Sequence, residues 1–131
     1  MARSRTVAVY TGDEISHYGF EDHPFSADRI HAFWDEMHVR QLADQVRILP
    51  SAMATEDQIR LFHTPEYVEK VKVYSEAGKG LLDCGDTPAY KGVFEDAAKV
   101  VGTVLDATRK VMHHEVRRVF APIAGLHHSM P

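Results

Sequence analysis

The order of strand-like and helix-like segments restricts the fold of this chain more than any other feature. Residues 7–10, 46–50 and 116–123 are short runs rich in branched and apolar side chains, a composition typical of β-strands. Segments with helical spacing of apolar residues separate them. Strands that alternate with helices favour parallel pairing through right-handed crossovers. We therefore expect an α/β fold with three layers, α/β/α, around a short, mainly parallel sheet of about three strands.

Start and stop signals mark three of the helical segments. Ser26 is a candidate cap for a helix whose apolar stripe runs through Ile30 and includes Trp34 as a core residue. Thr55 and Gln58 have capping-box spacing, which predicts a short helix over residues 56–63. Thr64 and Pro65 then predict the start of a further helix that ends near the glycines at 78 and 80.

The longest periodic segment, residues 92–113, predicts the longest helix. It follows a glycine-rich stretch, residues 78–88, that we expect to form a loop. The spacing of apolar residues indicates one buried side for this helix. The residues expected on that side are Val93, Ala97, Val100, Val104, Leu105, Thr108 and Met112.

The last strand segment, residues 116–123, is the most apolar of the three, as strands covered on both faces tend to be. A sheet of only three strands leaves one edge unpaired. Such an edge offers free backbone groups to another chain. The pattern therefore also predicts a homo-oligomer, or a missing part of the same domain that covers the edge.

Composition indicates a soluble globular protein. The 131 residues are 44% hydrophobic and 26% charged, which suits one domain over residues 1–131. The net charge is −4 without a basic block, so we expect no nucleic-acid partner. No run approaches the roughly 18 apolar residues of a membrane helix, and residues 1–5 lead into no apolar signal core. We expect a cytoplasmic protein without membrane contact. The single Cys84 excludes an intrachain disulfide.

A histidine pair, His127-His128, follows the third strand segment. Open α/β sheets place their catalytic and ligand-binding residues beyond the carboxyl ends of the strands, so this position favours a functional role for the pair. The dipeptide alone is a weak signal, because adjacent side chains on a strand point to opposite faces. A second pair, His113-His114, ends the longest helix, where positive charge suits the helix dipole, and we interpret it as structural.

Four stretches in order along the chain together resemble one family. They are Asp22-His23-Pro24-Phe25 leading to Asp28-Arg29, Phe62-His63-Thr64-Pro65-Glu66-Tyr67, Asp86-Thr87-Pro88-Ala89 with Gly92-Val93-Phe94, and Gly125-Leu126-His127-His128. This set resembles the arginase/deacetylase superfamily, specifically the histone deacetylase-like bacterial group that includes acetoin utilisation proteins and acetylpolyamine amidohydrolases.

The resemblance implies a chemistry and roles for four residues. In the family, a zinc or similar divalent ion held by Asp, His and Asp activates water to attack the acyl group of an acetylated amine. His127 and His128 match the catalytic pair that exchanges protons with the water and the leaving amine. Asp86 matches the rim aspartate that binds substrate amides, and Arg29 matches an arginine that lines an internal channel. The family's metal ligands match nothing in this chain, and its full domain has about eight strands.

Two hypotheses follow. In the first, the chain is the N-terminal part of a zinc-dependent deacetylase or amidohydrolase acting on acetylated amines, and by itself it binds no metal and is inactive. In the second, it is a free-standing, non-catalytic binding or assembly module of deacetylase descent that oligomerises through the exposed sheet edge. A variant of the second has a dimer in which the histidine pairs of two chains meet.

Two of the matched residues also have purely structural interpretations. Asp86 could begin a turn or help to cap a helix, and Arg29 could pair with Asp28 or Glu21.

Overall fold

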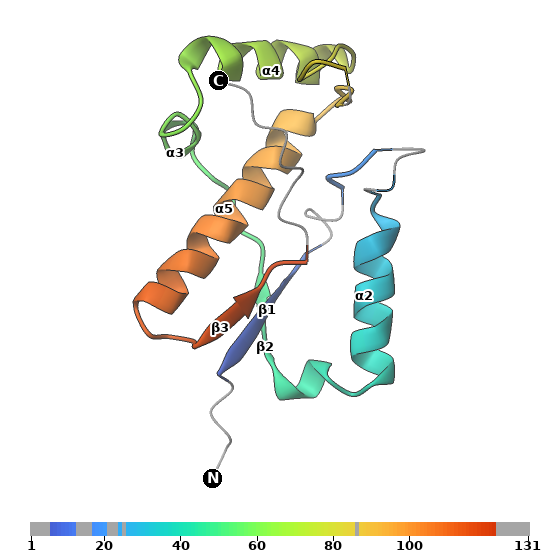
Figure 1. The fold of residues 1–131 in the computed structure, drawn as a ribbon, viewed down its shortest axis with the longest axis vertical. Helices are drawn as coiled ribbons and strands as arrows, with labels where there is room; N and C mark the ends of the chain where they lie inside the picture. Colours follow the sequence, from blue (N-terminus) through green and yellow to red (C-terminus); the bar gives the residue numbers. More distant parts are fainter. Residues whose placement is uncertain (1–5, 13–16, 21–23, 25, 86, 123–131) are drawn as a thin grey trace.

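The computed structural model describes residues 6–12, 17–20, 24, 26–85 and 87–122. Figure 1 shows that the strands lie between the long helices of residues 28–39 and 93–112, and that the helices of residues 56–59 and 65–77 lie at one end. In chain order the elements are β1 (Val7–Thr11), α2 (Asp28–Val39), a short 3-10 helix (Ala43–Gln45), β2 (Arg47–Pro50), α3 (Glu56–Ile59), α4 (Pro65–Ala77), α5 (Val93–Met112) and β3 (Arg118–Phe120).

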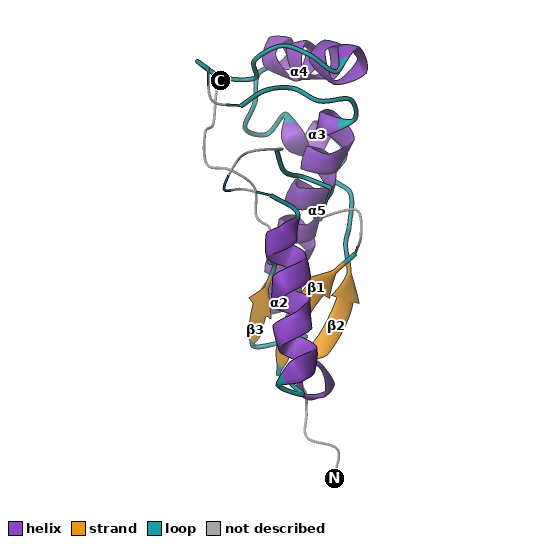
Figure 2. Cartoon of the chain, turned by 90° about the vertical axis from the view of Figure 1, so that its right-hand side faces the viewer, coloured by secondary structure: helices purple, strands orange, loops and turns teal. Residues whose placement is uncertain are grey.

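The three strands form one parallel sheet in the order β2-β1-β3. In the centre of the sheet, Val9 of β1 is in register with Ile48 of β2 and Phe120 of β3. Helix α2 covers one face and α5 the other, as the two views in Figures 1 and 2 show together. The expected three-layer α/β fold with a short parallel sheet is therefore confirmed.

The strand order explains why the two long helices lie on opposite faces. The chain passes from β1 to β2 through α2, and then returns past β1 to β3 through α5. These two crossovers run in opposite directions along the sheet. Crossovers of the same hand that run in opposite directions place their helices on opposite faces, which gives the three layers.

The third strand is shorter and more exposed than its sequence predicts. It comprises only Arg118–Phe120, and Phe120 is 49% exposed although its ring packs 5.3 Å from that of Phe33 on α2. Val116 precedes the strand and is buried beneath α5. The expectation of a strand covered on both faces is wrong for the described residues, because β3 lies at an edge of the sheet and not in its centre.

Side chains alternate across β1 and build the core on both faces. Ala8 and Tyr10 are fully buried on the side of α5, in a cluster with Leu49, Ala107 and Val116. A second cluster lies beyond the carboxyl edge of the sheet and joins the loop after β1, the start of α2, the loop before α5 and α5 itself. Its buried members are Tyr18, Phe20, Ile30, Leu82, Ala89, Val93 and Val100. Trp34 packs against this cluster, so its predicted core position is confirmed.

The predicted starts of α3 and α4 are confirmed, but α3 ends at Ile59 and not at residue 63 as expected. Thr55 and Gln58 form both bonds of the capping box. Thr64 accepts a hydrogen bond from the Tyr67 amide, and α4 ends at Gly78, which has the left-handed conformation with φ 65°. The start of α2 also differs from the prediction, because Ala27 and not Ser26 is the N-cap, and no side chain caps this helix. The carbonyl of Ser26 instead accepts from the Arg29 amide at 3.3 Å, so backbone groups close the first turn.

Helix α5 is rotated relative to the prediction. Val93 and Val100 are buried as expected, but Val104, Thr108 and Met112 are exposed. A close approach to residues 52–54 sets this rotation. The Ala54 amide donates to the Ala98 carbonyl at 2.9 Å, and a Cβ added to Gly102 would lie 2.3 Å from the Ala54 nitrogen. Because the backbone of residues 52–54 lies so close to α5, only glycine fits at position 102 of the helix. The larger side chains of α5 therefore project from the other sides of the helix.

Candidate active site

The carboxyl edge of the sheet is the place where this fold builds a site. The carboxyl ends of β1, β2 and β3 meet there because all three strands are parallel. The strand order reverses beside β1, and open α/β sheets bind ligands in the crevice at such a reversal. By this rule, we expect a crevice between the ends of β1 at Thr11 and β3 at Phe120. His127 and His128 lie outside the described residues, in the segment that follows β3.

The loop after β1 docks on the loop before α5 through aromatic side chains. Phe20 makes edge contacts with Tyr18 and Tyr90, with ring centroids 5.8 and 6.0 Å apart. The Tyr90 hydroxyl lies 3.2 Å from the His17 carbonyl and donates to Oδ2 of Asp96 at 3.0 Å. Burial, followed by the charge of Asp96, raises the pKa of Tyr90 far above its usual value. Tyr90 therefore stays protonated and holds the two loops together.

Asp83 organises the loop that contains Asp86. Its carboxylate accepts hydrogen bonds from the Gly85 amide at 3.0 Å, the Thr87 amide at 3.0 Å and the Thr87 hydroxyl at 2.6 Å. A backbone bond from the Leu82 amide to the Thr87 carbonyl, 2.9 Å long, closes the loop. Asp86 itself lies outside the described residues, but its two neighbours are both fixed by Asp83.

Arg29 lies in the first turn of α2, at the same edge of the sheet, and is exposed. The next residue, Ile30, is buried in the cluster that also contains Tyr18 and Leu82. The structure thus brings together the helix that carries Arg29 and the loop that carries Asp86. The roles of Arg29, Asp86, His127 and His128 stay predictions.

Sequence reasoning missed Asp83 and Tyr90 as organising residues. An aspartate four residues before a Thr-Pro pair is a recognisable turn signal, because short carboxylates bond nearby backbone amides. Tyr90 has no such local signal, since its partners His17 and Asp96 meet it only in the folded chain.

No metal ligand set is present among the described residues. In that part of the chain, no group of three or more His, Cys, Asp or Glu side chains is arranged to hold an ion.

Cys84 is exposed, in contrast to the half-buried position that a free cysteine usually takes. Across the described segments, no helix combines the length and apolar character needed to cross a membrane.

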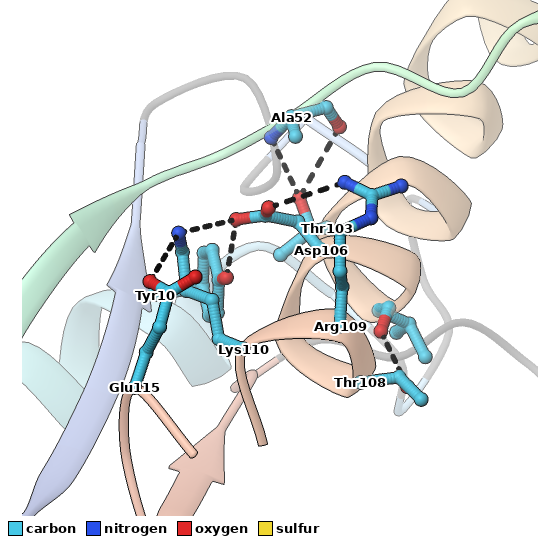
Figure 3. A network of polar contacts seen from close by, with 9 residues as sticks. Tyr10, Ala52, Thr103, Asp106, Thr108, Arg109, Lys110 and Glu115 are labelled. Atoms are coloured by element: carbon cyan, nitrogen blue, oxygen red, sulfur yellow. Dashed lines mark hydrogen bonds and ion pairs between the residues drawn. The ribbon is translucent and has the colours of Figure 1, made fainter. Parts of the chain in front are cut away.

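A polar network ties α5 to the sheet below the candidate site, as Figure 3 shows. The hydroxyl of the fully buried Tyr10 donates to Oδ2 of Asp106 at 2.6 Å. Lys110 lies 3.8 Å from the same oxygen and 3.4 Å from Glu115, and Arg109 lies 3.6 Å from Oδ1 of Asp106. Burial and the bond to Asp106 raise the pKa of Tyr10 strongly. We interpret this network as structural, because it fixes the position of α5 over β1.

Comparison with known proteins defines the family. The model of the histone deacetylase domain matches residues 23–131, which is most of the chain. The chain therefore belongs to the histone deacetylase domain family, as its motifs suggest.

Relatives and a solved structure agree with this assignment. The acetoin utilization protein AcuC of Bacillus subtilis is 28% identical over 95% of this chain and 34% of its own length. AcuC of Staphylococcus aureus strain MSSA476 is 29% identical over 98% of this chain and 35% of its own length. The crystal structure of the HDA15 HD domain superposes with a TM-score of 0.80 at 19% identity, covering 97% of this chain and 39% of that one, and this supports the fold. The chain spans about a third of the length of these curated relatives.

Proposed function

We propose that this chain supplies the N-terminal part of a metal-dependent deacetylase that removes acyl groups from acetylated amines. The observation that carries the proposal is the family match, which extends over residues 23–131 and so includes the histidine pair. The sheet supports it, because the pair follows a strand beside the reversal of strand order, and open α/β sheets bind ligands at such a reversal.

The proposed roles follow from the chemistry of amide hydrolysis. Attack by water requires a base to take its proton, and the departing amine requires an acid to supply one. Two adjacent imidazoles suit these roles, since their ordinary pKa lies near neutral pH. Asp86 would accept hydrogen bonds from substrate amides, and Arg29 would line the channel beneath the site.

The metal requires residues beyond those described. Catalytic zinc takes about three protein ligands, and the described residues offer no such group. We therefore assign no metal ligand to this chain. The proposal is that zinc is held elsewhere in a complete domain, and that the chain by itself binds none and hydrolyses no acyl group.

A chimera tests the roles of the histidine pair. Residues 1–131 would be joined to the part of B. subtilis AcuC that follows its matched third, and hydrolysis of an acetyl-lysine peptide measured. We expect metal-dependent hydrolysis, with His127→Ala and His128→Ala each lowering kcat by about 10²–10⁴-fold. His113→Ala, in the other histidine pair, should have no effect. A folded chimera without hydrolysis, or one that is insensitive to both active-site changes, would count against the proposal.

A second candidate function is a non-catalytic assembly module that associates through the sheet edge. The observation that favours it is the position of β3 at an edge of the described sheet, with Phe120 half-exposed. The intact mass of the natural gene product separates the two candidates. A mass of 14.8 kDa would favour the module, whereas a much larger mass would favour part of an enzyme.

A further inference from the structure

The loop before α5 is held in place by hydrogen bonds of its own. The Ala89 amide donates to the Gly80 carbonyl at 2.8 Å, and the Tyr67 hydroxyl of α4 donates to the Leu82 carbonyl at 2.9 Å. Together with the bonds of Asp83, these contacts fix the loop to itself and to α4. The loop is therefore a firm support for a segment that packs on it.

Tyr90 is the side chain of this support that the loop after β1 contacts at three positions. The His17 carbonyl lies 3.2 Å from the Tyr90 hydroxyl, and the Gly19 amide forms a backbone hydrogen bond to the same group. The buried Phe20 ring meets the Tyr90 ring edge-on, with centroids 6.0 Å apart. The ring contact holds the loop against the core, whereas the hydroxyl fixes its backbone.

Asp96 orients the Tyr90 hydroxyl. Its carboxylate accepts the phenolic proton at 3.0 Å and is buried, with 9% of the residue exposed. It lies in the first turn of α5, where the positive end of the helix dipole favours a carboxylate. A phenol has only one proton to donate. Because Asp96 takes this proton, the lone pairs of the Tyr90 oxygen are left to accept from the Gly19 amide.

The two loops lie beside the place where the proposed reaction would occur. The loop after β1 begins at the carboxyl end of that strand, at the reversal of strand order where open α/β sheets bind ligands. The loop before α5 contains Asp86, for which we propose contacts with substrate amides. The histidine pair follows β3 and belongs to neither loop. A change in how the loops meet should therefore alter substrate binding and not proton transfer.

We propose that Tyr90, oriented by Asp96, is a positioning residue for substrate binding, which holds the loop after β1 in place beside the approach to the site. The inference rests on the proposed deacetylase function and names a residue that tunes it. A binding surface that is already ordered loses less entropy when the substrate binds. Loss of the hydroxyl should weaken the binding of substrate and transition state equally, which raises KM and leaves kcat unchanged.

Hydrogen exchange in the 131-residue chain tests the contact between the loops without any catalysis. Tyr90→Phe keeps the ring that packs on Phe20 but removes the hydroxyl. We expect exchange of the amides of residues 18–20 to accelerate about 3–10-fold, the factor that one ordinary hydrogen bond contributes. The Ala89 amide, which is bonded within the loop before α5, is the internal control and should change much less. Unchanged exchange at residues 18–20 would overturn the proposal.

Steady-state kinetics of the AcuC chimera test the consequence for the substrate. With the acetyl-lysine peptide, Tyr90→Phe and Asp96→Ala should each raise KM about 3–10-fold and change kcat by less than about twofold. Asp96→Asn still offers an amide oxygen to the phenolic proton, so KM should return toward the native value.

Thr103→Val is the matched control for lost stability. It removes a fully buried hydroxyl of α5 that accepts a hydrogen bond from the Ala52 amide at 3.1 Å. This bond lies away from both loops, so the variant should be less stable but should keep the native KM.

The outcomes separate this inference from the proposed function. An active chimera with the same KM in Tyr90→Phe as in the native sequence, or with an equal rise in Thr103→Val, would overturn the positioning role alone. A fall in kcat without a rise in KM would do the same. A folded native-sequence chimera without hydrolysis would overturn the proposed function, and the positioning role with it.

Discussion

The Tyr10 hydroxyl donates a 2.6 Å hydrogen bond to Oδ2 of Asp106, which joins the central strand to the longest helix across 96 positions of sequence. Tyr10 is fully buried, and Asp106 is also close to Lys110 and Arg109. This bond fixes α5 over β1, and therefore fixes where the loop before α5 meets the loop after β1.

Tyr10→Phe removes the hydroxyl group, so the Asp106 carboxylate loses this hydrogen-bond donor. We expect the free energy of unfolding to fall by about 1–3 kcal/mol, the usual effect of losing a hydrogen bond to a charged group. Urea denaturation at neutral pH measures it. Glu76→Gln, on the exposed surface of α4, should change stability by no more than about 0.5 kcal/mol. An equal effect of both changes would show that the bond contributes nothing.

Stability should fall at alkaline pH because of Tyr10, which is fully buried, and Tyr90, which is partly buried. The pKa values of Tyr10 and Tyr90 are raised in the folded chain, chiefly by burial. Below the unfolded value of about 10, both states keep these protons. Above it, the unfolded chain releases them and the folded chain does not, so the free energy of unfolding falls by up to about 1.4 kcal/mol per pH unit for each tyrosine. Tyr10→Phe should reduce this slope in urea denaturation between neutral pH and about pH 11, and an unchanged slope would contradict the expectation.

Gly102→Ala should destabilise the chain although alanine is the better helix former. The added methyl would lie 2.3 Å from the Ala54 nitrogen and 2.5 Å from the Ala52 carbonyl oxygen. The overlap should exceed the helix-propensity gain of about 1 kcal/mol, because overpacking typically costs about 1–3 kcal/mol or more. Thermal unfolding tests this directly: a higher melting temperature would show that residues 52–54 move away at little cost.

The starts of α3 and α4 could be predicted because their causes are local. Thr55 with Gln58, and Thr64 with Pro65, satisfy backbone groups within one turn, so their spacing in sequence is sufficient. The rotation of α5 could not be predicted, because it depends on contact between Gly102 and residues 52–54, which are distant in sequence. For the same reason, periodicity assigned Val104 and Met112 to the core. The candidate site residues came from the family resemblance, whereas Asp83 and Tyr90 required the folded loops.

Asp83→Ala should loosen the loop that contains Asp86. Without the carboxylate, the Gly85 and Thr87 amides lose their acceptor. Bonds to charged groups contribute about 1.5–3 kcal/mol, so hydrogen exchange at these two amides should accelerate by about tenfold or more. The Ala89 amide, which donates to the Gly80 carbonyl, serves as a control and should change less. Unchanged exchange at Gly85 and Thr87 would remove Asp83 from its organising role.

We propose that this chain contributes the proton-transfer part of a deacetylase site without a complete metal centre. The most direct measurement is release of acetate from an acetyl-lysine peptide by the purified 131-residue chain with added zinc. We predict no turnover above the buffer rate, with or without the metal. Robust turnover that a chelator abolishes and that His127→Ala or His128→Ala eliminates would contradict the claim, because it would show that the chain forms a working metal site by itself.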